Sequence, residues 1–211
     1  MTNVLTEISA AEMVKRLLDG ERDFASTRIA SDKGDFSKTE GFEALNRYLP
    51  TQDLRENPII ITGADWKGVK AAGLFLNAVK AAGINLEGAD LRNADVSGTT
   101  FVGCRLMEAD FTDAIMRGVD LYEANLSKGK LVNCDLTRAY TLRLNLGEVD
   151  MTNATMTDAN LYRSDLRGAI GLETVRDLGT CQFKHTAVTS RERDVILAAM
   201  EALPRFDLRT E

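Results

Sequence analysis

A five-residue pattern runs through residues 84–173 without an insertion or a deletion. Its middle position is apolar in 16 of 18 units, and the exceptions are Thr141 and Gly171. A small side chain lies two residues before the middle position in 16 of 18 units, and the exceptions are Ile84 and Leu144. Such a short and regular array is typical of a solenoid, in which each repeat stacks on its neighbours.

The period itself restricts the backbone. A repeat of five fits neither a helix, whose side chains recur every 3.6 residues, nor a two-faced strand, whose side chains alternate. It fits a chain that turns a corner in every unit and stacks each turn on the one before. The middle residue and the small residue would then point inward, and the others would face outward. Stacked turns should rise by roughly 4.7–4.9 Å, the spacing of hydrogen-bonded strands.

The units ADLRN, ADFTD and ANLYR resemble the pentapeptide repeat family, whose consensus is A-(D/N)-L-X-X. The segment Gly168–Leu172 also resembles the end of the repeats in many members. This resemblance implies an all-β solenoid, a right-handed quadrilateral β-helix of pentapeptide repeats with four units in each coil. We expect short α-helical segments at the N- and C-termini of this solenoid.

The same frame extends upstream into residues 59–83, where every inward position is apolar. Glycine recurs there at the fifth position of the unit, at Gly63, Gly68, Gly73 and Gly83. The alternative is a helix over residues 66–82, in which each interior glycine would cost about 1 kcal/mol relative to alanine. We favour degenerate coils, because terminal repeats are often atypical.

Other segments flank the repeats. We predict an N-terminal capping helix, an isolated repeat-like start, an insertion with a short helix, and a tail with a C-terminal helix. Together with the repeats they divide the chain into residues 1–21, 22–31, 32–58, 59–173 and 174–211. Caps are expected because the end of a solenoid exposes its core and an unpaired strand edge.

Three local signals mark where these helices begin. The capping-box pattern Ser9-x-x-Glu12 opens the N-terminal helix, and Thr189-x-x-Glu192 opens the C-terminal one. Thr39 is the expected cap of the helix in the insertion. The expected apolar stripe of the C-terminal helix is Ile196, Met200 and Leu203.

Charge and hydropathy restrict the partners. The chain has 26 basic and 32 acidic residues, a net charge of −6. A mildly acidic surface argues against direct binding of nucleic acid, because phosphate contacts need clustered lysine and arginine. It gives no reason to expect a membrane surface. No segment has the apolar length of a transmembrane helix, and the first residues do not form a signal peptide. We therefore expect a cytoplasmic protein, and the family is commonest in bacteria.

The three cysteines do not indicate a metal or a disulfide. Cys104 and Cys134 occupy the small inward position, where cysteine serves as a compact apolar residue. In a four-unit coil they fall on opposite faces, so a disulfide between them would not reach. Cys181 lies in the tail. No cysteine or histidine pair has ligand spacing, so we predict no metal site.

The sequence contains no recognisable catalytic machinery. His185 is the only histidine, and it follows the repeats. No nucleophile elbow and no glycine-rich phosphate loop occurs, so we expect neither an enzyme nor a cofactor. The recurring outward aspartates are better explained as solvated faces or turn hydrogen bonds than as paired carboxylates or calcium ligands.

These observations favour a non-catalytic scaffold or adaptor that presents a rigid solenoid face to a protein partner of unknown identity. The resemblance also implies an alternative, a DNA-mimic modulator of DNA gyrase of the quinolone-resistance type. Those proteins dimerise through a C-terminal element, so the helix over residues 190–203 could form a homodimer contact here. Against this alternative, loops interrupt their coils, whereas residues 84–173 have no interruption and carry lysine and arginine among the acids.

One face of the predicted solenoid differs from the others. If four units make one coil, side chains 20 residues apart stack on one another, and the outward residues of three faces are mostly polar or charged. The fourth carries Val102, Tyr122, Tyr140, Leu142 and Tyr162, flanked by Arg143 and Arg163. Tyrosine and arginine beside aliphatic residues are typical of interface hot spots, so we predict that these residues form the protein-binding face. The alternative is that the insertion or a terminal helix covers them.

Overall fold

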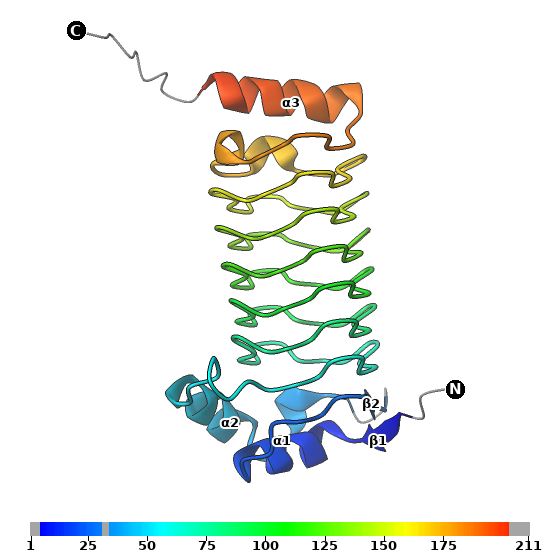
Figure 1. Ribbon diagram of the computed structural model, residues 1–211, viewed down its shortest axis with the longest axis vertical. Helices are drawn as coiled ribbons and strands as arrows, with labels where there is room; N and C mark the ends of the chain where they lie inside the picture. The colour runs from blue at the N-terminus through cyan, green and yellow to red at the C-terminus, as the bar shows by residue number, and fades with distance from the viewer. Residues whose placement is uncertain (1–4, 31–33, 203–211) are drawn as a thin grey trace, which may run out of the picture.

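Parallel backbone bridges join residues 20 positions apart, from the Ile60–Lys80 pair to the Asp150–Ile170 pair. Each coil therefore contains four pentapeptides and has four faces. The computed structural model describes residues 5–30 and 34–202. It shows the coils stacked into a column with helices at both ends (Figure 1). The predicted right-handed quadrilateral β-helix with short terminal helices is confirmed.

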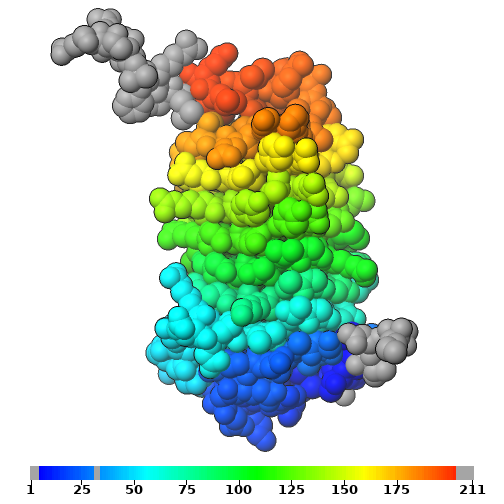
Figure 2. All heavy atoms as spheres, viewed as in Figure 1, coloured from blue at the N-terminus to red at the C-terminus, as the bar shows by residue number. Residues whose placement is uncertain are grey.

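The elements outside the coils are short. The helices and strands are β1 (Thr6–Ile8), α1 (Ala10–Leu18), β2 (Thr27–Ile29), α2 (Phe42–Tyr48) and α3 (Ser190–Glu201). The 3₁₀ turns within the described residues are η2 (Phe36–Lys38), η3 (Leu49–Thr51), η4 (Leu172–Thr174) and η5 (Leu178–Thr180). The caps sit directly on the column, as the space-filling view shows (Figure 2). Within the described residues, no helix has the length and hydropathy needed to cross a membrane.

The fifth residue of each unit turns the corner of the coil. It has a left-handed backbone in glycine units and in others alike, with φ of 66° at Gly98, 55° at Glu123 and 57° at Arg143. Glycine adopts this conformation without strain, whereas most other residues lose about 1–2 kcal/mol there. The glycines that recur at the fifth position of the sequence are therefore corner residues.

The inward positions form one continuous core. The residues that break the sequence rule keep their inward places, since Thr141 and Ile84 are fully buried and Leu144 is 1% exposed. The same turn pattern runs through residues 59–83, so this segment consists of coils and not of a helix. Buried apolar side chains of consecutive coils stack on one another, which supplies the main driving force for folding.

Polar groups at the small inward position are satisfied by the coil beneath. The thiol of Cys104 donates to the carbonyl oxygen of Ala81 at 3.1 Å, and that of Cys134 donates to Phe111 at 2.6 Å. Both acceptors lie 23 residues earlier. Burial raises the pKa of both thiols to about 12, which keeps them protonated at neutral pH. All three cysteines are free and buried.

The recurring outward aspartates and asparagines form turn hydrogen bonds. Asp90 Oδ1 accepts from the backbone N–H of Arg92 at 3.3 Å, and Asn125 Oδ1 accepts from that of Ser127 at 3.1 Å. All eleven such residues of the 84–173 block make this bond to the residue two positions on. The interpretation of these side chains as local turn acceptors is therefore confirmed.

The N-terminal end of the column is closed by segments that precede the regular coils. Asp23 bridges to Ile60 and Arg28 to Asp65, so the repeat-like start forms the first turns of the stack. β1 then pairs in parallel with β2 and adds one more layer. α1 is capped by the Ser9 hydroxyl, and its buried residues are Ala10, Met13, Val14 and Leu17.

The insertion packs on the column through α2. The Asn46 side chain donates to the carbonyl of Gly73 at 2.8 Å and accepts from the N–H of Phe75 at 3.1 Å. One side-chain amide thus satisfies backbone groups that another coil would otherwise pair. Thr39 does not cap α2, contrary to the sequence prediction. The N-cap is Gly41, and the Thr39 hydroxyl instead donates to the carbonyl of Phe36 at 2.8 Å.

At the C-terminal end, the ladder continues beyond residue 173. Thr155 bridges to Arg176, Asn160 to Gln182 and Asp165 to Ala187. The interval is therefore 21 residues and then 22, so this coil contains first one and then two residues more than a regular coil. The first extra residue enters at Gly171, where φ is +72° and a Cβ would lie 2.6 Å from the Thr152 Cα. Only glycine fits this position. Cys181, assigned to the tail from the sequence, is a buried inward residue.

α3 lies across the end of the column (Figure 1). Its N-terminus has the capping box of Thr189 and Glu192 that the sequence indicates. Of the expected stripe, Ile196 is 6% exposed and packs on the column, but Met200 is 47% exposed and points away. Leu203 lies outside the described residues. The stripe prediction is wrong for Met200, because a helix lying on a flat end buries only a narrow line of side chains.

Met116 and Ile115 test the inward frame, because these neighbours point in opposite directions. Met116 is fully buried, whereas Ile115 is 42% exposed. Met116→Ala should lower the free energy of unfolding by roughly 2–5 kcal/mol, since the truncation leaves a cavity. Ile115→Ala should lower it by about 1 kcal/mol or less. Urea unfolding followed by circular dichroism measures both changes, and equal losses would contradict the frame.

Acid should weaken the column through its aspartate–arginine pairs. Asp90 binds Arg92 at 2.7 Å and Asp165 binds Arg167 at 2.5 Å, and these hydrogen bonds lower the pKa of both carboxyls. A carboxyl with a lowered folded-state pKa stabilises the fold above its unfolded pKa of about 4, and this contribution is lost as the pH falls through the folded value. The free energy of unfolding should therefore decrease below about pH 4.

The double variant Asp90→Asn with Asp165→Asn should lose less stability on acidification than the unaltered chain. Asparagine removes the titrating group but keeps the turn acceptor, as Asn125 does in its own unit. The measurement is urea unfolding at pH 7 and pH 3. The same acid sensitivity in both proteins would show that these pairs do not carry the effect.

Candidate protein-binding face

The predicted protein-binding residues lie on one of the four faces of the column. We call it the tyrosine face and define it as residues 59–63, 79–83, 99–103, 119–123, 139–143, 159–163 and 181–185. Its bridge residues stack in one line from Ile60 to Gln182. It carries four basic and two acidic side chains, whereas the three other faces hold more acids than bases over residues 64–173.

Two tyrosines stack in the middle of this face. The rings of Tyr122 and Tyr140 lie 6.5 Å apart between centroids with an interplanar angle of 24°. Tyr140 is 43% exposed, so much of its side chain is accessible to a ligand. Stacking holds both rings in place, so little side-chain entropy would be lost on binding.

An ion pair borders these tyrosines. Arg143 Nη1 lies 2.5 Å from Glu123 Oε1, and both residues occupy the corner position of consecutive coils. Hydrogen bonds from Tyr122 and then from Arg143 lower the pKa of Glu123. The charge of Arg143 is therefore largely balanced within the face.

Tyr162, one coil beyond Tyr140, contacts two further side chains of this face. The Arg163 guanidinium lies over its ring, 5.2 Å from the centroid. The His185 ring meets it edge-on, with centroids 5.6 Å apart and an interplanar angle of 81°. These contacts fix Arg163 and His185 beside an aromatic surface, a geometry that favours cation–π attraction.

The structure brings the predicted residues together with different exposures. Tyr122, Tyr140, Arg143, Tyr162 and Arg163 form the contiguous group described above. Val102 lies one coil closer to the N-terminus, and Leu142 follows the buried Thr141 without a shift in register. Val102, Tyr122, Leu142 and Tyr162 are half-buried, whereas Tyr140, Arg143 and Arg163 are exposed.

The insertion docks elsewhere in the described structure. Its contacts through Asn46 are to Gly73 and Phe75, which lie on a different face from the tyrosines. Its later residues line a surface hollow with the same Phe75 and with Ala78. α3 packs on η4 and η5 at the end of the column. The tyrosine pair therefore faces outward.

Sequence reasoning missed three members of the face. Glu123 pairs with Arg143, and Lys184 and His185 follow Tyr162 in the last coil. The two extra residues after residue 170 shift the spacing from 20 to 22, so stacking at a constant interval does not reach them. The run CQFKH at residues 181–185 still has the small–polar–apolar order of a unit, and a search allowing a shift would have found it.

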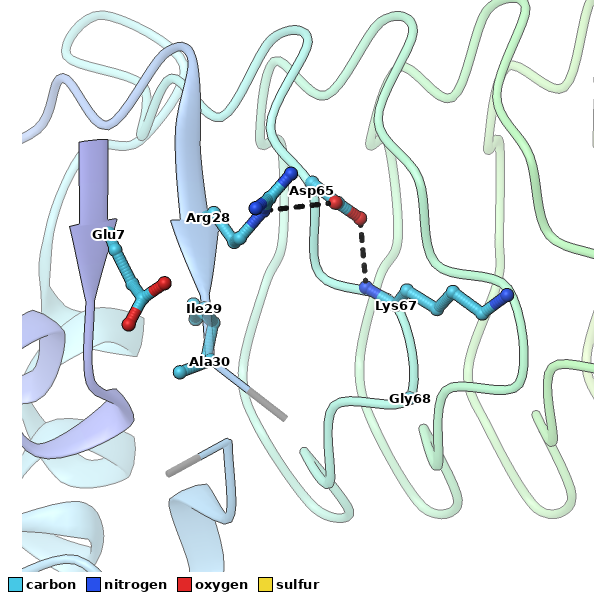
Figure 3. A pocket seen from close by; sticks show the side chains of 7 residues that line it. All are labelled: Glu7, Arg28, Ile29, Ala30, Asp65, Lys67 and Gly68. Carbon is cyan, nitrogen blue, oxygen red and sulfur yellow. Dashed lines mark hydrogen bonds and ion pairs between the residues drawn. The ribbon is translucent and has the colours of Figure 1, made fainter. Parts of the chain in front are cut away.

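Elsewhere in the described structure, no group of side chains indicates a binding site as clearly as the tyrosine face does. A surface hollow of about 590 Å³ lies near β1 and β2 (Figure 3) and is lined by Glu7, Arg28, Ile29, Ala30, Asp65, Lys67 and Gly68. Arg28 Nε lies 3.3 Å from Asp65 Oδ2, so these two charges of its wall pair with each other. Within residues 5–30 and 34–202, no three acidic, cysteine or histidine side chains are grouped to hold a metal ion.

A family model of pentapeptide repeats, with eight copies, matches residues 76–106, 104–140 and 143–170. The coils over residues 76–140 and 143–170 are pentapeptide repeats of this family.

Solved structures of pentapeptide repeat proteins are similar to this chain. One from the thylakoid lumen of Arabidopsis thaliana is 26% identical with a TM-score of 0.36, over 46% of this chain and 65% of that one. QnrB1, a plasmid-mediated fluoroquinolone resistance protein, is 14% identical with a TM-score of 0.30, over 69% and 87%. HetL, involved in heterocyst differentiation regulation in the cyanobacterium Nostoc, is 16% identical with a TM-score of 0.22, over 85% and 94%. The chain thus spans about 65% of the length of the Arabidopsis protein. No curated protein sequence matches it.

Proposed function

We propose that this protein is a non-catalytic scaffold or adaptor that presents the tyrosine face to a protein partner. The observation that carries the proposal is the stacked pair of Tyr122 and Tyr140, with Tyr140 43% exposed, beside Tyr162 and its arginine. Tyrosine and arginine are enriched among the few residues that carry most of the binding energy of protein interfaces. A rigid column suits this role, because its surface is already in place before the partner arrives.

Two further parts of the proposal follow from side-chain chemistry. The thiols of Cys104, Cys134 and Cys181 are buried and their pKa is raised to about 12, so they are poor nucleophiles and support a non-catalytic role. Free thiols are usual in reducing compartments, which supports the cytoplasm as the proposed location.

We also propose that α3 forms a contact between two copies of the chain. Leu197 is 50% exposed and Met200 is 47% exposed, and they lie one turn apart on the outer side of this helix. Apolar side chains gathered at one end of a molecule favour an interface. The gyrase-modulator alternative requires such a dimer, and it stays a prediction that a supercoiling assay with purified gyrase would test.

The tyrosine face can be tested with the double variant Tyr122→Ala and Tyr162→Ala. If the face binds a partner, affinity capture from the source organism should lose the partner while the melting temperature falls by only a few degrees, since both rings are half-buried. The matched control is Ile115→Ala, which removes an exposed apolar side chain from a different face. A large fall in melting temperature would show that the tyrosines belong to the core instead.

The α3 contact can be tested by solution mass. The double variant Leu197→Glu and Met200→Glu places two charges in the proposed apolar contact and should convert a dimer into a monomer, as measured by light scattering. Ile115→Glu is the control, because it introduces a charge at an exposed apolar site outside α3. A monomer for the unaltered chain at high concentration would refute the contact.

A further inference from the structure

We propose that the partner binds the tyrosine face through an acidic segment, with a carboxylate seated beside Arg163, Lys184 and His185. The inference rests on the proposed function, because it concerns the same face and names the chemistry of its partner. It assigns the charged half of the contact to the last two coils and the apolar half to the tyrosine pair.

The first argument is the charge left over on this face. Arg143 is balanced by Glu123, but Arg163 and Lys184 make no ion pair with any residue in the described part of the chain. They are adjacent in space, because the N–H of Arg163 donates to the carbonyl of Lys184 at 3.1 Å. Two neighbouring uncompensated cations attract an anionic ligand.

The second argument is preorganisation. Arg163 and His185 both occupy the corner position, with φ of 58° and 62°, so their side chains leave consecutive coils at the same edge of the face. Both side chains contact the Tyr162 ring, which holds each of them near it. An arginine held in one orientation presents its planar donors to a carboxylate at a lower entropic cost than a free one.

The third argument concerns spacing. Tyr140 lies one coil from Arg163 and two coils from Lys184 along the column, which corresponds to roughly 5–10 Å. An extended chain advances about 3.3 Å per residue, so a peptide lying along the column would span this distance in two or three residues. The expected recognition element is therefore an aromatic or aliphatic residue followed or preceded, two or three positions away, by an acidic one.

Fluorescence anisotropy with the full chain tests this inference. The probe is a fluorescein-labelled peptide of repeating leucine and glutamate, and the comparison peptide carries lysine in place of glutamate. We expect the acidic peptide to bind, the basic peptide not to bind, and added salt to weaken binding. Arg163→Ala with Lys184→Ala should weaken binding about tenfold, as expected for the loss of two exposed charge contacts.

The matched control is Arg105→Ala with Lys128→Ala, which removes the same charge from a neighbouring face. It should leave the affinity unchanged, and melting temperatures should be the same for both double variants. An equal loss of affinity in the control would show a general electrostatic attraction and would overturn the assignment of the carboxylate to Arg163 and Lys184. Absence of binding at the highest protein concentration, or equal binding of the basic peptide, would overturn the acidic chemistry.

Two outcomes separate this inference from the proposed function. If Tyr122→Ala with Tyr162→Ala abolishes capture of a partner but the Arg163 and Lys184 variant does not, the face binds protein without a carboxylate beside Arg163 and Lys184. If neither variant changes capture, the proposed function itself fails. Binding of an oligothymidine that the Arg163 and Lys184 variant loses would instead assign the face to single-stranded nucleic acid, since aromatic and basic side chains also form such sites.

Discussion

The hydrogen-bond ladder between coils is the constraint from which the rest of the structure follows. In the regular coils each backbone bridge joins residues 20 positions apart, so every side chain there lies directly above its equivalent in the coil before. A unit that kept a residue too many would displace all later side chains on every face. This requirement explains why the irregular residues Thr141 and Leu144 stay inward and why Leu142 stays outward. In a column of this kind, residues separated by one coil in the sequence are neighbours in space. Surface groups therefore contain residues that are far apart in the chain.

At each end of the ladder, backbone groups would be left buried and unpaired, which costs free energy. The two ends avoid this cost by different means. At the N-terminal end, the Asn46 amide replaces a missing coil on one face. Arg22 joins the elements of that cap, since its guanidinium donates to the carbonyl of Leu17 at 2.9 Å and to the Tyr48 hydroxyl at 3.1 Å. At the C-terminal end, the left-handed Gly171 admits an extra residue and the coil widens before α3 covers it.

The regular part of the fold could be predicted from the sequence because a five-residue period with fixed inward positions is compatible with few backbone conformations. The stacked turns and their inward and outward positions follow from that period. The four-unit coil, and with it the grouping of Tyr122 with Tyr162, follows from the resemblance to pentapeptide repeats. The features that could not be predicted depend on contacts outside it. Lys184 and His185 join the tyrosine face only because two residues are inserted before them. The replacement of Thr39 by Gly41 as the cap of α2, and the exposure of Met200, depend on how each helix meets the column.

Stacking also decides which face has free charge. Opposite charges that recur at an interval of 20 neutralise each other, as Lys67 does with Glu87 at 2.7 Å and Arg143 with Glu123 at 2.5 Å. Within a unit, Asp165 neutralises Arg167 in the same way. At the edge of the tyrosine face the corner residues are Glu123, Arg143, Arg163 and His185, so the one acid there neutralises only one of the two arginines. The surplus of positive charge at that edge is therefore a consequence of the ladder itself, and it lies where the aromatic side chains are held in place.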